Sequence, residues 1–181
     1  MKGKLIVVSG PSGVGKGTIV KELVRRREDV IESVSCTTRA PREGEVDGRE
    51  YFFLTKEEFR RRIQENAFLE YDDHFENYYG TPADFVKERL KSKSVILEID
   101  VKGGLSVKKA MPECVLVMIA PPSVEELKRR LVSRGTETQE QIEKRLSRLA
   151  FEMEQADEYD FVIVNDELER AIGELSAIID K

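Results

Sequence analysis

The chain has 181 residues, enough for one domain with a sizeable core. Charged residues make up 36% and hydrophobic residues 40%, which is the balance of a globular protein and not of a disordered or membrane-embedded chain. The net charge of −5 argues against broad nucleic-acid binding, and no apolar run approaches the ~20 residues of a membrane span. We therefore expect a cytoplasmic protein without nucleic-acid or membrane partners, in which Cys36 and Cys114 are free buried thiols.

The most informative stretch is residues 5–18. The apolar run Leu5–Ser9 predicts a buried strand, a glycine-rich turn follows it, and a helical pattern begins at Lys16. This is the context of a phosphate-binding P-loop, in which backbone N–H groups and a helix N-terminus converge on an anion. We expect the phosphates of a nucleoside triphosphate to bind along this loop, which comprises Gly10, Pro11, Ser12, Gly13, Val14, Gly15, Lys16, Gly17 and Thr18.

Two residues of the loop bear on its chemistry, Lys16 and Gly17. Lys16 is placed to reach the outer phosphates and is the first candidate catalytic residue. Gly17 stands where the common P-loop pattern has serine or threonine. The hydroxyl for a magnesium ion must then come from Thr18, or the metal contact passes through water.

Four further apolar runs follow in chain order. Together with the first run they predict buried parallel strands in an α/β layer fold; they are Val30–Val34 (a weaker run), Val95–Ile99, Cys114–Ala120 and Phe161–Val164. Helix starts are marked by capping-box spacing at Thr55 with Glu58, Ser123 with Glu126 and Thr138 with Gln141. Thr81 precedes Pro82 as a candidate N-cap, and the last helix is expected after Asn165-Asp166.

Two insertions interrupt this α/β alternation. Residues 35–80 hold short strand-like pieces, a small helix and most of the aromatic residues, and residues 127–149 form an arginine-rich helical hairpin around Gly135. Both are expected at the carboxyl ends of core strands, where ligands bind in open α/β sheets. The predicted organisation is one domain, with a core of residues 1–34, 81–126 and 150–181.

Outside the P-loop, two pairs of charged residues are candidates for binding. Arg39 and Arg42 flank a proline-stiffened turn and are able to converge on one phosphate, although a solvated basic loop is the alternative. Glu98 and Asp100 share one face at the end of a buried strand, where magnesium or a ribose hydroxyl would give them a partner. Capping of the next helix is the alternative role of Asp100.

Several of these motifs occur together in the order found in guanylate kinases. The chain resembles that family over essentially its whole length in Gly10–Thr18, Ser35–Arg42 with Gly44, Gly48 and Tyr51, Tyr78–Thr81, Glu98–Asp100 and Val162–Asp166. The resemblance implies a P-loop nucleotide kinase fold: a five-stranded parallel core flanked by helices, a GMP-binding insert (35–80) and a mobile lid (127–149). It also implies transfer of the γ-phosphoryl group of ATP to GMP, with Mg²⁺ as cofactor.

The resemblance further assigns residues to each substrate. It implies that the GMP phosphate binds Arg39, Arg42, Tyr51 and Tyr79. It implies that guanine binds Ser35, Glu70 and Thr81 over a floor of Glu98 and Asp100, and that Asn165 lies beside the adenine. Arg134 and Arg145 are the lid arginines expected to reach the transferring phosphoryl group with Lys16 and Arg39, whereas Arg130 and Arg148 are auxiliary candidates. Magnesium is expected near Thr18 and Asp100, directly or through water.

The sequence disfavours two other functions. A non-catalytic guanylate-kinase-like interaction module would lack a working P-loop and lid arginines, but this chain has both. A kinase for AMP or another monophosphate is disfavoured by Ser35, Glu70 and Thr81.

Lys102 departs from the glutamine of the family pattern, and His74 is expected to be a surface residue. The expected partners are ATP and GMP, with the chain a monomer or small homo-oligomer.

Overall fold

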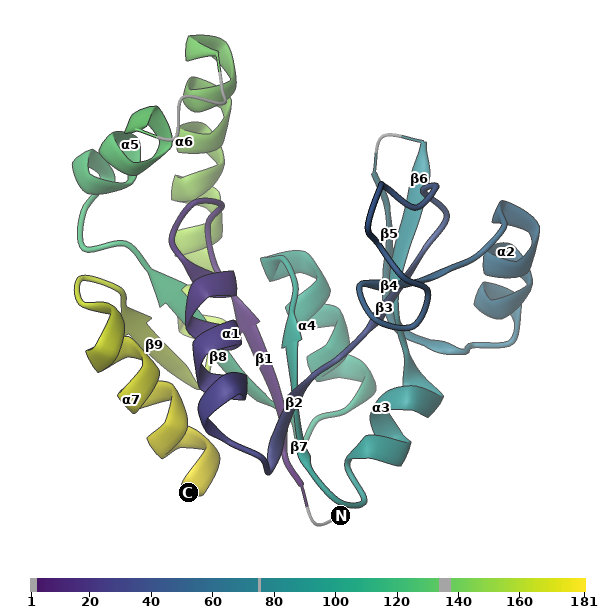
Figure 1. The fold of residues 1–181 in the computed structure, drawn as a ribbon. Coiled ribbons are helices and arrows are strands. Elements are labelled where there is room, and N and C mark those ends of the chain that lie inside the picture. The colour runs from purple at the N-terminus through teal and green to yellow at the C-terminus, as the bar shows by residue number, and fades with distance from the viewer. Residues whose placement is uncertain (1–2, 75, 134–137) are drawn as a thin grey trace.

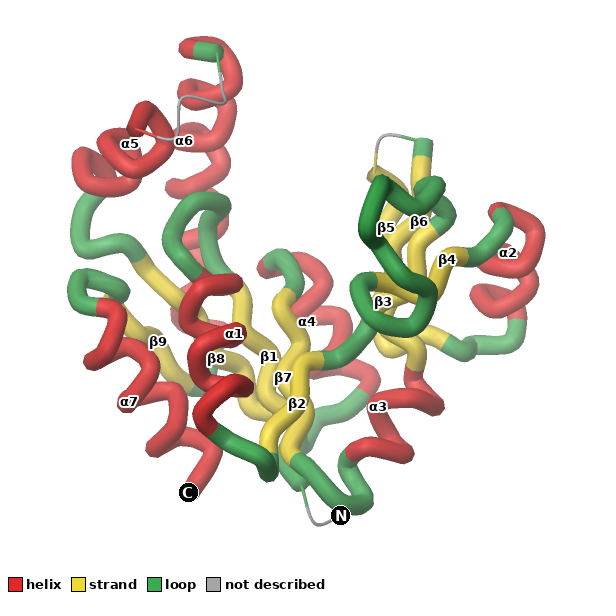
Figure 2. Tube along the Cα trace, viewed as in Figure 1, coloured by secondary structure: helices red, strands yellow, loops and turns green. Residues whose placement is uncertain are grey.

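The computed structural model describes residues 3–74, 76–133 and 138–181. Its core is a five-stranded sheet in the order β2-β7-β1-β8-β9, in which every neighbouring pair is parallel (Figures 1 and 2). The predicted parallel core is therefore confirmed. Its strands are β1 (Leu5–Ser9), β2 (Val30–Glu32), β7 (Ser94–Glu98), β8 (Val115–Ala120) and β9 (Phe161–Val164).

The central strand β1 is buried along its whole length because helices cover both faces of the sheet. Alternate residues point to opposite faces. Ile6 and Val8 pack with α1 (Lys16–Arg26) and α7 (Leu168–Asp180). Leu5 and Val7 pack on the other face with α3 (Ala83–Arg89) and α4 (Val101–Ala110). The continuous apolar runs in the sequence follow from this double coverage.

The insert forms a second sheet beside the core. Its strand order is β4-β3-β6-β5, with β3 and β4 parallel and the other pairs antiparallel; the strands are β3 (Ser35–Thr37), β4 (Tyr51–Phe53), β5 (Phe68–His74) and β6 (Asn77–Pro82). Helix α2 (Lys56–Gln64) packs against this sheet through Phe59, which stacks on Phe68 and Tyr78. The predicted strand over Val30–Val34 is too long, because β2 ends at Glu32 and the chain passes into the second sheet.

The arginine-rich segment forms the predicted hairpin of two helices, α5 (Val124–Ser133) and α6 (Gln139–Glu154), and a 3₁₀ turn follows (Gln155–Glu158). Leu127 and Leu131 of α5 pack against Ile142 and Leu149 of α6. Gly135, the expected turn residue, lies outside the described residues. The hairpin and the insert rise on opposite sides of the carboxyl edge of the core sheet (Figure 1).

The expected helix starts have mixed outcomes. The capping boxes at Thr55 and Thr138 are confirmed, with both reciprocal bonds present. Ser123 accepts the N–H of Glu126 at 3.0 Å, but the Glu126 carboxylate binds arginines instead of closing the box.

The expectation that Thr81 caps a helix is wrong. Thr81 belongs to β6, and α3 begins at Ala83 after Pro82 as its N-cap. The Thr81 hydroxyl donates instead to the Glu70 carboxylate at 2.6 Å. The Thr81 hydroxyl therefore binds a half-buried acceptor on the neighbouring strand and does not cap the helix, and local spacing in the sequence does not show this contact.

Both cysteines, Cys36 and Cys114, are buried free thiols, as expected. Burial raises the pKa of each thiol to about 11. Neither is therefore set up as a reactive thiolate. Among the described helices, none is long and apolar enough to cross a membrane.

Phe59 gives a direct test of the insert's packing. Its side chain is 0% exposed, and its ring centroid lies 4.4 Å from that of Phe68. Phe59→Ala should lower the free energy of unfolding by about 3–5 kcal/mol, because it removes a large buried ring and leaves a cavity. Urea denaturation measures this change. Phe151→Ala is the matched control, since Phe151 is 63% exposed; equal losses for both variants would contradict the described packing.

Candidate active site

The loop between β1 and α1 has the geometry of a P-loop. A Cβ atom at Gly10 would lie 2.2 Å from the carbonyl oxygen of Ile119 in β8, so only glycine fits there. Gly15 adopts a φ of +101° at the start of α1, a conformation that glycine accepts without strain. These residues let the loop turn tightly over the end of β1 and open toward solvent at the N-terminus of α1.

Lys16 lies across this loop. Its Nζ atom donates to the carbonyl oxygens of Gly10 at 2.6 Å and Pro11 at 3.1 Å. Burial lowers the pKa of Lys16, while the charges of Glu98, Glu152 and Asp100 act in the opposite direction. The ammonium group is thus held at the loop, beside the space where phosphates would bind.

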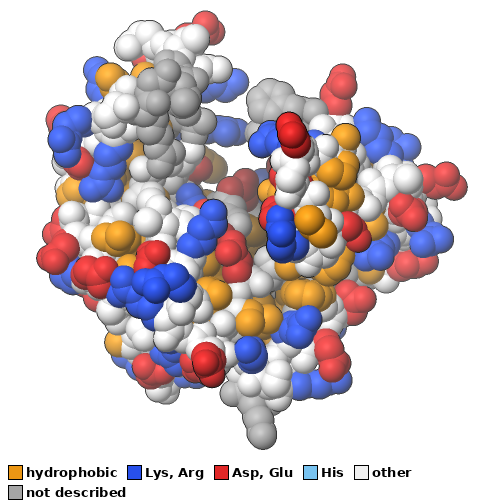
Figure 3. All heavy atoms as spheres, viewed as in Figure 1, with side chains coloured by type: hydrophobic (Ala, Val, Ile, Leu, Met, Phe, Trp, Pro, Cys, Tyr) orange, Lys and Arg blue, Asp and Glu red, His pale blue; other side chains and the backbone are white. Residues whose placement is uncertain are grey.

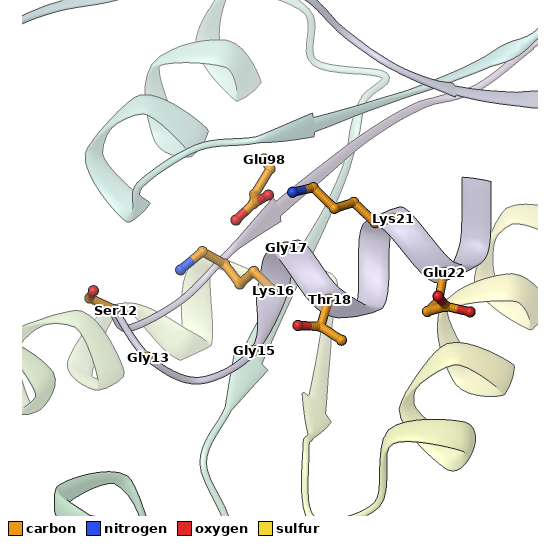
Figure 4. Close-up of a pocket in the computed structure, with 9 residues that line it drawn as sticks. All are labelled: Ser12, Gly13, Gly15, Lys16, Gly17, Thr18, Lys21, Glu22 and Glu98. Atoms are coloured by element: carbon orange, nitrogen blue, oxygen red, sulfur yellow. The ribbon is translucent and has the colours of Figure 1, made fainter. Parts of the chain in front are cut away.

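A cavity of about 480 Å³ lies beside the loop and is lined by Lys16, Gly17, Thr18, Lys21 and Glu98 among others (Figure 4). Glu98 points to Gly17: its carboxylate oxygens lie 3.2 and 3.5 Å from the position that a Cβ atom at Gly17 would occupy. Thr18 projects from the other side of α1 (Figure 4). The carboxylate therefore faces the position where the common P-loop pattern has a hydroxyl.

Asp100 is the N-cap of α4. Its Oδ1 atom accepts the N–H of Gly103 at 2.7 Å, so the capping role considered from the sequence is observed. Asp100 and Thr18, the two expected metal ligands, line different cavities. One oxygen of Asp100 is engaged in the cap, and the residue also lines a second cavity, a cleft that reaches from the P-loop to the insert.

Glu70 of β5 lines the same cleft as Asp100 and lies close to α4. It accepts a hydrogen bond from Thr81, and its Oε2 atom lies 3.2 Å from the position of a Cβ atom at Gly103. Burial raises the pKa of Glu70, the bond from Thr81 lowers it, and the nearby Asp100 raises it. Ser35, Thr81 and Glu98 line an adjoining cavity of about 260 Å³ with Tyr51. The three residues expected to bind guanine are therefore neighbours.

Arg39 has an acidic partner that the sequence analysis missed. Its guanidinium group makes two bonds to Glu45, at 2.8 and 2.9 Å, and Glu45 also accepts the backbone N–H of Arg42 at 2.7 Å. Hydrogen bonds from Arg39 and from the Arg42 backbone lower the pKa of Glu45 to about 2. Glu45 lies six positions after Arg39, so no local spacing rule in the sequence pointed to this contact.

Aromatic rings surround the same arginine. The Arg39 guanidinium carbon lies 5.4 Å from the ring centroid of Tyr51 and 5.9 Å from that of Phe53. The rings of Tyr51 and Tyr79 meet edge to face at 6.0 Å. Arg42 is exposed at the rim. The expected phosphate-binding residues thus lie around one point on the insert.

The P-loop and the insert share one cleft of about 650 Å³, and Figure 3 shows the hollow between the hairpin and the insert. Its lining joins Lys16 of the P-loop to Glu70 and Tyr79 of the insert. Helix α6 adds three residues to the wall, namely Arg148, Phe151 and Glu152, of which sequence reasoning missed the last two.

Five further positions singled out from the sequence lie elsewhere or outside the described residues. Arg134 lies outside the described residues, and so do the side chains of Arg145 and His74. Asn165 is buried below the P-loop, where its side chain contacts the backbone. Lys102, the departure from the family pattern, forms an exposed ion pair of 2.8 Å with Asp72 of β5.

Comparison with known proteins gives a consistent result. A model of the guanylate kinase family matches residues 2–181. The guanylate kinase of Caldanaerobacter subterraneus subsp. tengcongensis is 49% identical over 179 residues, covering 98% of this chain and 87% of that protein. The guanylate kinase of Bacillus cereus is 51% identical over 180 residues, covering 98% of this chain and 88% of that protein.

A solved structure agrees with these relatives. The crystal structure of guanylate kinase from Anaplasma phagocytophilum has a TM-score of 0.75 to this chain at 35% identity, covering 98% of this chain and 85% of that one. The family model and these relatives extend over nearly the whole length of the chain, including the P-loop and the insert. The chain therefore belongs to the guanylate kinase family.

Proposed function

We propose that this chain transfers the γ-phosphoryl group of ATP to GMP, giving ADP and GDP, with the triphosphate on the P-loop and GMP on the insert. One observation supports the assignment of the two substrates to different parts of the site. The same cleft is lined by Lys16 at one end and by Glu70 and Tyr79 at the other. Two nucleotides bound at these ends would meet with their phosphates between them.

Glu70 is the proposed reader of guanine. Guanine presents N1–H and the N2 amine as adjacent donors, and a carboxylate accepts one with each oxygen. Adenine has an unprotonated N1 and no N2 amine, so a buried carboxylate would stay unpaired against it. Ser35 and Thr81 add hydroxyl groups beside Glu70, and Glu98 and Asp100 form the floor.

Arg39, Arg42, Tyr51 and Tyr79 are the proposed ligands of the GMP phosphate. In the described structure the two terminal nitrogens of the Arg39 guanidinium group, here called the fork, donate to the two oxygens of the Glu45 carboxylate. A phosphate oxygen pair makes the same bidentate bonds. Glu45 thus supports the assignment, because it shows that the fork faces a position that accommodates an anion.

Residues 10–18 are the proposed triphosphate site. Lys16 stabilises the charge that develops on the transferring group, together with Arg39 and with Arg134 and Arg145 of the lid, residues 127–149. The phosphate oxygen of GMP is already a nucleophile, so the reaction requires positioning and charge neutralisation more than a general base. Closure of the insert and the lid would exclude water and so prevent hydrolysis of ATP.

The residues present fit a magnesium ion that is shared with substrate phosphates. In the parts of the chain that are described, no group of three or more acidic, histidine or cysteine side chains could hold a metal alone. Magnesium commonly keeps several waters and binds one or two carboxylates plus phosphates. Glu98, facing Gly17, is the carboxylate beside the loop, with Thr18 and Asp100 as further candidates. When bound, the ion would neutralise charge on the phosphate oxygens.

Substrate choice is tested by measuring ADP formation with GMP, AMP, UMP or CMP as acceptor. GMP should be strongly preferred.

Glu70→Gln should lower kcat/KM for GMP by at least about tenfold, because the amide accepts from only one of the two guanine donors. The KM for ATP should change little, and Glu57→Gln, on an exposed site of α2, is the matched control. Equal use of AMP and GMP by the wild type would refute the assignment of Glu70.

The bond from Thr81 to Glu70 gives a second prediction. Because this bond favours the charged carboxylate, Thr81→Val should raise the pKa of Glu70 further above its ordinary value. The pH titration of the side-chain carboxyl carbon of Glu70 by NMR measures the shift. Thr81→Ser keeps a hydroxyl and should stay near the wild type. An unchanged or lowered pKa of Glu70 in Thr81→Val would show that the hydroxyl does not stabilise the charged form of the carboxylate.

A further inference from the structure

Asn165 makes an unusual contact beneath the P-loop. It follows β9, is only 8% exposed, and donates from Nδ2 to the carbonyl oxygen of Val14 at 2.7 Å. The two residues are 151 positions apart in the sequence, and the bond is fully buried. A buried amide that reaches a loop carbonyl holds that peptide group in one orientation.

The loop is shaped to admit this side chain. A Cβ atom at Gly15 would lie 2.5 Å from Nδ2 of Asn165, so a side chain at Gly15 would collide with the amide. Val14 itself is fully buried. Glycine is therefore needed at position 15 for two reasons. It adopts the φ of +101° just before α1 begins, and it leaves room for the side chain of Asn165.

The orientation of this peptide has a consequence for phosphate binding. The carbonyl of Val14 and the N–H of Gly15 belong to one planar trans peptide and point in opposite directions. A bond that fixes the carbonyl toward Asn165 therefore fixes the Gly15 N–H away from it. Backbone N–H groups at this point of a P-loop are the ones that receive phosphate oxygens.

Helix α5 is attached to the same place. Arg130 donates from Nη2 to the backbone carbonyl of Asn165 at 3.0 Å and from Nε to Glu126 at 2.8 Å. The next residue of α5 is Leu131, and its Cδ2 atom lies 2.7 Å from the position of a Cβ atom at Gly13. The C-terminal half of α5 thus lies against the P-loop at Gly13 and against the residue that supports it, Asn165.

We infer that Asn165 is a positioning residue for the triphosphate site: it orients the Val14–Gly15 peptide for phosphate binding, and Arg130 ties this support to helix α5. The inference rests on the proposed nucleotide site at the P-loop. This role differs from recognition of adenine. The amide nitrogen of Asn165 already binds the carbonyl oxygen of Val14. Loss of that bond would therefore weaken the binding of any ligand that has a phosphate chain.

Inorganic tripolyphosphate separates these two roles, since it has the phosphate chain of ATP and no base. Calorimetric titrations in the presence of magnesium should be done with ATP, tripolyphosphate and GMP on the wild type and on Asn165→Ala. We expect the affinities for ATP and for tripolyphosphate to fall together by about tenfold, the loss typical of a buried hydrogen bond. The affinity for GMP should stay unchanged, which a general loss of structure would not allow.

Each outcome decides a different claim. A wild type that binds neither ATP nor tripolyphosphate would refute the proposed nucleotide site itself. A wild type that binds both while Asn165→Ala binds them equally well would overturn the positioning role alone. A loss for ATP with tripolyphosphate unaffected would assign Asn165 to the adenine and also overturn it.

Arg129 offers a matched control for Arg130. Both arginines bind Glu126, but Arg130 alone of the two also reaches the carbonyl of Asn165. Arg130→Met should weaken tripolyphosphate binding by about threefold to tenfold, and Arg129→Met should leave it unchanged. Equal effects would refute the tie to α5. This pair keeps the inference testable if Asn165→Ala does not fold, and thermal unfolding of every variant shows which ones do.

Discussion

A P-loop binds phosphate well only if its peptide groups are already oriented when the nucleotide arrives, because preorganised dipoles cost no rearrangement. Several parts of the described structure hold the P-loop backbone in place. β1 is paired on both sides, to β7 and β8, and this fixes where the loop begins. The backbone of β8 leaves room only for glycine at Gly10, and Lys16 bonds the first two carbonyls of the loop. Asn165 supports the loop from β9.

The charged groups of the site illustrate a second constraint. In the proposed site two anionic nucleotides would lie close together, and the charged side chains proposed to bind them need partners until the substrates arrive. Arg39 binds Glu45, Lys16 binds backbone carbonyls, and the Glu70 carboxylate accepts from Thr81. Each group is thereby held in place, and each has an interaction that a substrate atom would join or replace.

Much of the fold could be predicted from the sequence, for physical reasons that differ by element. Leu5–Ser9 and Phe161–Val164 match β1 and β9 because buried parallel strands give continuous apolar runs bounded by turn residues. The capping boxes at Thr55 and Thr138 are local and were readable for that reason. Thr81 was not, because its partner Glu70 lies on a neighbouring strand.

The residues of the candidate site differ in how far the sequence could place them, and their roles stay predictions. The P-loop is a contiguous motif, and the residues of the insert came from the resemblance to a family. Asn165 and Glu45 show the limit, since the roles of these side chains depend on contacts that tertiary structure creates. Asp100 was ambiguous between a ligand and a helix cap, and the structure shows the cap. The cap does not exclude a ligand role, because Asp100 also lines the cleft, and that role stays a proposal.

The central claim is that the P-loop directs the terminal phosphoryl group of ATP onto GMP. The most direct measurement uses ATP radiolabelled in its γ-phosphate and follows the label into GDP and inorganic phosphate, for the wild type and for Lys16→Met. The wild type should place the label in GDP and little in inorganic phosphate. Lys16→Met should lose transfer by about a hundredfold to a thousandfold while it still binds GMP. Transfer by Lys16→Met at the wild-type rate would contradict the account.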